Sequence, residues 1–76
     1  MELKELGEKL SDMYHNAPSG DKVAMIHLFG IKYADEIKQY KFSKKDITKQ
    51  ADIPDSYITE IMKGVKLAKY VKEKNR

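Results

Sequence analysis

The sequence has no cysteine and no tryptophan, and it contains only two prolines and four glycines among 76 residues. Without cysteine the chain can form neither a disulfide framework nor a thiolate metal site, as is usual in a reducing cytoplasm. Its longest mainly apolar run, residues 23–31, is nine residues long, whereas a membrane-spanning helix needs about 20. The N-terminal stretch lacks the basic start and apolar run of a signal peptide. We therefore expect a cytoplasmic protein with no membrane partner.

Motifs for catalysis or cofactor binding are also missing. There is no glycine-rich phosphate loop and no nucleophile beside an evident base, and His15 and His27 lack the spacing of a metal site. The acid pairs Glu5/Glu8 and Asp35/Glu36 fit solvated helix faces better than acid/base machinery. We expect no enzyme activity, no catalytic residues, no metal, no cofactor and no small-molecule ligand. His27, inside the apolar run, is expected to be a hydrogen-bonded core or interface residue.

The composition is that of one small folded domain spanning residues 1–76. Hydrophobic residues make up 41% and charged residues 36%, which is too apolar for intrinsic disorder. A chain this short buries only about 60% of its unfolded surface. The core must therefore be built from side chains, with or without help from a partner subunit.

Charge is distributed unevenly along the chain. The net charge is +3, and the isoelectric point is about 9.1. Residues 1–37 carry four lysines against seven acids, a net −3, whereas residues 38–76 carry ten lysines and one arginine against five acids, a net +6. This asymmetry indicates either a C-terminal half that faces a polyanion or a lysine-rich surface that supports solubility.

Apolar periodicity predicts helices in the first half. Leu3, Leu6, Leu10 and Met13 recur at three- and four-residue steps, which predicts an amphipathic helix over 2–15. A loop rich in Asn, Pro, Ser, Gly and Asp follows, in which Ser19 or Asp21 can cap the next helix. That helix, expected over 21–40, is apolar on nearly every side at its start and should be central to the bundle. Within it, Gly30 indicates the close approach of another helix.

The second half predicts shorter helices. Ser43 is expected to cap a helix over 44–50, with Asp46 completing a capping box. Residues 51–54 interrupt it, and Pro54 opens a helix over 54–63 that Gly64 ends. A last helix is expected over 65–72. The predicted fold is all-α, a compact bundle of four to five helices: supporting helices in 1–40, a helix-turn-helix in 43–64, and a C-terminal helix with a basic tail in 65–76.

The stretch 46–64, DITKQADIPDSYITEIMKG, carries the functional signal. Its buried positions are expected to be Ile47, Thr48, Ala51, Ile53, Ile58 and Ile61. In this spacing it resembles the helix-turn-helix of small bacterial and phage repressors. Ala51 stands where that family more often has Leu, Thr48 adds a hydroxyl at the close helix contact, and Asp52 replaces the usual Gly of the turn. Asp tolerates the left-handed backbone needed there better than most residues.

The resemblance implies sequence-specific binding of double-stranded DNA by a small transcription regulator, with the helix 54–63 in the major groove. The exposed candidates for base contacts are Asp55, Ser56, Tyr57, Thr59, Glu60 and Lys63. The candidates for phosphate contacts are Ser43, Lys44, Lys45, Lys49 and Lys66. The acids Asp55 and Glu60 must either meet base edges or turn aside, because phosphates repel them. Tyr57 either contacts DNA or is a partly buried ring with a wet hydroxyl.

Two further alternatives remain open from the sequence. Such motifs commonly bind two half-sites as a symmetric homodimer, whose interface would come from the first or second helix, but the same apolar residues also suit packing within one chain. A protein interaction module, such as an adaptor or an antitoxin-like partner, would use the same helical hairpin without binding DNA. The target sequence and any effector cannot be read from the residues.

Overall fold

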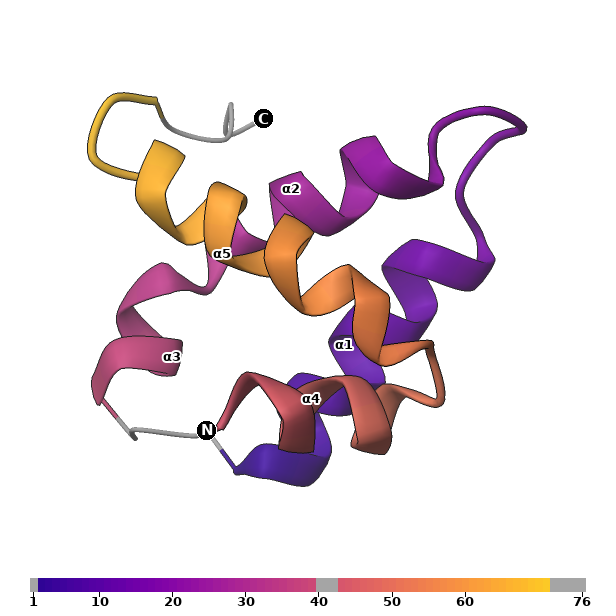
Figure 1. Cartoon of the computed structure of the whole chain (residues 1–76), viewed down its shortest axis with the longest axis horizontal. Helices are drawn as coiled ribbons and strands as arrows, with labels where there is room; N and C mark the ends of the chain where they lie inside the picture. The colour runs from indigo at the N-terminus through magenta and orange to yellow at the C-terminus, as the bar shows by residue number, and fades with distance from the viewer. Residues whose placement is uncertain (1, 40–42, 72–76) are drawn as a thin grey trace.

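Helices form all the regular secondary structure in residues 2–39 and 43–71, the part of the chain that the structure describes. In this computed structural model the elements are α1 (Leu3–His15), α2 (Lys22–Lys32), α3 (Ala34–Gln39), α4 (Lys44–Ala51), the 3₁₀ turn η1 (Asp55–Tyr57) and α5 (Ile58–Leu67). The all-α fold class and the number of helices are confirmed. Figure 1 shows α4 and α5 joined by a tight turn, with α1 and α2 packed against them.

The core lies where these helices meet. Its fully buried side chains include Leu6 and Leu10 of α1, Phe29 of α2, Ile47 of α4 and Ile61 of α5. The amphipathic pattern of the first helix is confirmed, since α1 spans nearly the predicted residues and turns this apolar stripe toward α2 and α4. Every helix thus contributes at least one residue to a single core, because α3 adds the buried residues Ala34 and Ile37.

Two glycines let α2 and α5 cross in backbone contact. A Cβ atom built on Gly30 would lie 2.6 Å from the carbonyl oxygen of Ile61 and 2.8 Å from the Cα atom of Gly64. A Cβ atom on Gly64 would meet the carbonyl oxygen of His27 and lie 2.9 Å from the Cα atom of Gly30. Neither position has room for a side chain. The close approach predicted at Gly30 is confirmed, and its partner is Gly64.

The expected role of Gly64 as a helix end is therefore wrong. Gly64 lies inside α5, which runs without interruption from Ile58 to Leu67, so the separate helices over 54–63 and 65–72 do not form. Packing explains the difference. Because α2 lies against the backbone at Gly64, this glycine permits the helix crossing, and α5 continues past it to Leu67. The helix ends instead in turns at residues 68–70, where the Tyr70 N–H donates to the carbonyl oxygen of Leu67 at 2.8 Å. The predicted end near residue 72 lies outside the described residues.

The single helix expected over 21–40 is also wrong. The chain departs from helical geometry at Tyr33, with φ −109° and ψ 20°, and α3 continues in a new direction. A straight helix over 21–40 would be about 30 Å long, which exceeds the 28 Å longest extent of the molecule. The break returns Ala34 and Ile37 to the core. Residue 40 lies outside the described part.

Capping differs from expectation as well. Ser43 and Asp21 occupy the N-cap positions of α4 and α2, but neither side chain makes a capping hydrogen bond, so the capping box with Asp46 does not form. Asp52 does adopt the left-handed conformation expected of it, with φ 60° and ψ 48°. Its N–H donates to the carbonyl oxygen of Lys49 at 3.2 Å, which closes α4 before the turn.

The crossing of α2 and α5 makes Gly30→Ala and Gly64→Ala destabilising. Each added methyl group must push two backbones apart, and overpacking of this kind costs about 1–3 kcal/mol. We expect the free energy of unfolding, measured by urea titration, to fall by that amount in each variant. Thr59 is an exposed residue of α5, the helix that contains Gly64. The control variant Thr59→Ala should therefore alter the free energy of unfolding by less than about 0.5 kcal/mol. Equal stability of all three variants would contradict the close helix crossing.

Candidate nucleic-acid interface

The segment α4–η1–α5 has the inner face of a helix-turn-helix. Ile47, Ala51, Ile53 and Ile61 are buried, as the spacing predicts. The turn is tied to α4 because the N–H of Ile53 donates to the carbonyl oxygen of Thr48 at 3.1 Å. Ile58, expected as a second buried anchor of the recognition helix, is only half-buried. It is the first residue of α5, so its side chain lies at the edge of the core.

Asp55 of η1 makes a side-chain hydrogen bond with α4. The side chain of Thr48 is fully buried, and its hydroxyl proton is shared between the carbonyl oxygen of Lys45 at 3.0 Å and Oδ1 of Asp55 at 3.1 Å. The hydroxyl that departs from the family pattern therefore joins α4 to η1. This contact engages one carboxylate oxygen of Asp55, which is an exposed residue. Its base contact stays a prediction.

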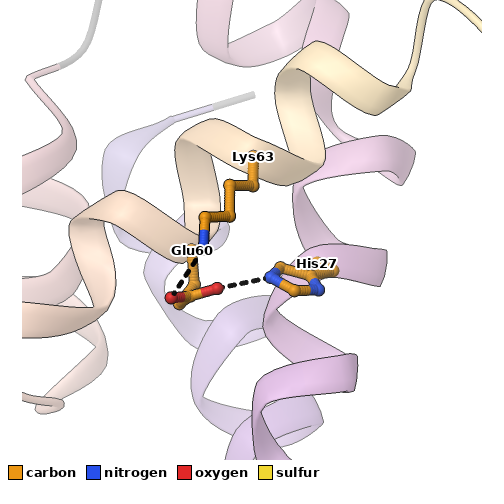
Figure 2. Close-up of polar contacts among 3 residues, drawn as sticks. All are labelled: His27, Glu60 and Lys63. Atoms are coloured by element: carbon orange, nitrogen blue, oxygen red, sulfur yellow. Dashed lines mark hydrogen bonds and ion pairs between the residues drawn. The ribbon is translucent and has the colours of Figure 1, made fainter.

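Glu60 is engaged by α2, as Figure 2 shows. Nε2 of His27 donates to Oε1 of Glu60 at 2.5 Å, and Nζ of Lys63 lies 3.5 Å from Oε2. Only 23% of the Glu60 side chain remains exposed. Both carboxylate oxygens of Glu60 therefore have partners within the protein, and its base contact stays a prediction. The hydrogen-bonded role expected of His27 is confirmed.

These contacts change the electrostatics of Glu60. The hydrogen bond from His27 lowers the pKa of the Glu60 carboxyl below its usual value, and Lys63 lowers the pKa further, against the opposing effect of partial burial. Glu60 is thus a carboxylate at neutral pH, hydrogen-bonded by His27 of α2 and paired with Lys63 of α5. Sequence reasoning missed this pairing, because no local signal links residues 33 positions apart.

Tyr57 belongs mainly to the protein interior. Its ring is half-buried and packs edge-on against the ring of Tyr14, with centroids 5.3 Å apart. The two hydroxyl groups share a hydrogen bond of 3.3 Å, which raises the pKa of the Tyr57 hydroxyl and keeps it neutral. Of the two roles left open by the sequence, the partly buried ring is the one that the geometry supports.

Four of the candidate base-contacting residues are exposed on this segment, and Asp55 is one of them. Ser56, Thr59 and Lys63 are exposed, as is the candidate phosphate contact Lys66, whereas Ile61, Gly64 and Val65 are buried on the opposite side of α5. We call Ser56, Thr59, Lys63 and Lys66 the α5 stripe. Hydroxyl and ammonium groups of this kind can bond to base edges.

The remaining phosphate candidates cluster on α4. Ser43, Lys45 and Lys49 are exposed and Lys44 is half-buried. The first N–H groups of α4 have no partner within the helix, so the lysines and these donors present positive charge together. These phosphate candidates lie on α4 or at its N-cap, whereas Lys66 lies on α5.

The architecture is therefore that of a helix-turn-helix protein. A family model described as "HTH-like domain" matches residues 2–74, and the chain belongs to that family. The match extends well beyond the stretch 46–64 from which the resemblance was inferred, so the supporting helices are part of the domain. Neither the curated proteins nor the solved structures contain a match to the chain. No helix among the described residues is long and apolar enough to cross a membrane.

The pairing of Glu60 with His27 makes stability depend on pH in a defined direction. Because the folded-state pKa of Glu60 is lowered, its contribution is present above the unfolded-state pKa and is lost as pH falls through the folded-state pKa. We expect Glu60→Gln to be less stable than the wild type at neutral pH, and the difference to shrink in acid. Urea titrations between about pH 3 and pH 7 measure this.

A matched variant separates this pairing from other effects at Glu60. The pKa of Glu60 can be followed by NMR of the carboxyl carbon. In His27→Gln this pKa should rise toward the ordinary value, because the imidazole whose hydrogen bond lowers it most is removed. His15→Gln, which alters an exposed histidine of α1, should leave it unchanged. A Glu60 pKa insensitive to His27→Gln would show that the contact does not form in solution.

Proposed function

We propose that the protein binds double-stranded DNA sequence-specifically, as a small transcription regulator, with α5 in the major groove. The observation that carries the proposal is the α5 stripe, a row of exposed hydroxyl and ammonium groups beside two acids that each have a hydrogen-bond partner within the protein. Glu60 is paired with His27, and Asp55 with Thr48. Phosphates repel carboxylates. Lys63 offsets this repulsion at Glu60, whereas Asp55 remains exposed.

Within this proposal the candidate residues have two different tasks. Ser56, Thr59 and Lys63 contact base edges, where hydroxyls donate or accept and an ammonium donates to guanine. Ser43, Lys44, Lys45, Lys49 and Lys66 contact phosphates, which position the protein without selecting a sequence. The net charge of +6 over residues 38–76 supports association with a polyanion. A symmetric dimer on two half-sites about 34 Å apart is the arrangement that such motifs commonly use.

The competing proposal is a protein interaction module, and one observation favours it. Leu67, Tyr70 and Val71 are exposed by 41%, 80% and 46% near the end of α5, and exposed apolar groups that lie together mark protein contacts. Mobility shift on a generic duplex separates the two functions. Binding that weakens steeply with salt supports the DNA proposal, whereas no shift down to about 50 mM salt rejects it.

Substitutions on the two elements should have different signatures. Thr59→Ala and Lys63→Ala should each lose about 1–3 kcal/mol of discrimination at particular base pairs. Lys44→Ala should weaken binding to all sequences alike and make the salt dependence shallower by about one unit of slope. Selection from a random duplex library, repeated with each variant, measures preference and half-site spacing together.

Lys9→Ala on α1 is the matched control, because Lys9 is exposed and lies on a supporting helix. Its selected sequences and affinity should equal those of the wild type. If all four variants lowered binding uniformly, the assignment of α5 as the reading helix would be wrong.

A further inference from the structure

The break between α2 and α3 brings a lysine beside α5 that the helix-turn-helix pattern does not include. Lys38 of α3 lines a hollow of about 210 Å³ together with Lys66 and Lys69, and the floor of this hollow is formed by Met62 and Val65. We call Lys38, Lys66 and Lys69 the lysine triad. A helix that continued straight past Tyr33 would carry Lys38 away from α5.

The lysine triad concentrates positive charge without neutralisation. All three side chains are exposed, no acid lines the hollow, and within residues 2–39 and 43–71 none of the three forms an ion pair. Like charges held close together repel, so an anion placed among them is favoured. Lys63 of α5 differs from these three lysines, because it has Glu60 as a partner.

The surface chemistry of the hollow matches a nucleic-acid backbone better than a free anion. Met62 is 42% exposed and Val65 is almost fully buried, and both line the hollow, so an apolar surface lies beside the ammonium groups. A phosphodiester backbone presents charged phosphates joined by largely apolar deoxyribose rings. Inorganic phosphate would use the lysines alone.

The position of the hollow also suits the backbone that borders a helix in the major groove. Lys66 belongs both to the α5 stripe and to the lysine triad, so the two surfaces are continuous. The end of α3 at Gln39 is five Cα–Cα steps from the start of α4 at Lys44, which limits their separation to about 19 Å. Figure 1 shows these two helix ends on the same side of the molecule.

We propose that Lys38, with Lys66 and Lys69, binds the phosphodiester backbone of DNA beside the α5 stripe, so that α3 is a backbone-contacting element in addition to α4. This inference rests on the proposed function and deepens it. The supporting helices then take part in binding, because the turn at Tyr33 delivers one of the three cations.

The test is the salt dependence of binding to a short generic duplex, which requires no knowledge of the target sequence. For duplex DNA the slope of log K against log salt changes by about 0.9 for each phosphate contact. Between about 50 and 200 mM salt, Lys38→Gln should therefore make the slope shallower by about 0.9, and the double variant Lys38→Gln/Lys69→Gln by about 1.8. Thermal unfolding midpoints should equal that of the wild type, because both side chains are exposed.

Lys4→Gln removes the same charge from an exposed position on α1 and should leave the slope unchanged. If the wild type binds the duplex and the salt slope of Lys38→Gln equals that of the wild type, the inference is overturned and the proposed function stands. An equal change in Lys4→Gln also overturns it, since the effect would then be one of net charge. Failure of the wild type to bind any duplex overturns the proposed function and this inference together.

Discussion

The contact between Gly30 and Gly64 sets the geometry on which the rest of the molecule depends. Because neither residue has a side chain, α2 and α5 approach until their backbones touch. This close approach fixes the position of α5 relative to the supporting helices. It also brings His27, three residues before Gly30, against Glu60, four residues before Gly64. A looser crossing would leave that carboxylate without its strongest partner.

The pairing of Glu60 with His27 is a consequence of this packing. The helix-turn-helix contains acids at two positions where a DNA-binding face tolerates them poorly, Asp55 and Glu60. The fold engages each through a different neighbour: a buried hydroxyl on α4 for Asp55 and an imidazole on α2 for Glu60. The exposed polar residues of α5 carry the hydroxyl of Thr59 and the ammonium groups of Lys63 and Lys66. The supporting helices therefore shape the charge of the candidate interface as well as its position.

Much of the fold could be predicted because it is encoded locally. The periodicity of leucines predicts α1, the spacing of isoleucines predicts the inner face of α4 and α5, and Asp52 takes the left-handed turn that its side chain tolerates. Two of the errors have the same origin. Gly64 as a helix end and an unbroken helix over 21–40 are both sound local interpretations, which packing against other helices overrides.

The sequence by itself determined the helical class, the turn between α4 and α5, and the need for a close contact at Gly30, because each depends on residues within a few positions of one another. Only the tertiary structure decided which partners the acids of η1 and α5 have, since Asp55 bonds to Thr48 of α4 and Glu60 to His27 of α2. It likewise decided that Lys38 lies beside Lys66 and Lys69. Such pairings depend on how helices cross and where they break, and these are properties of the packed core as a whole.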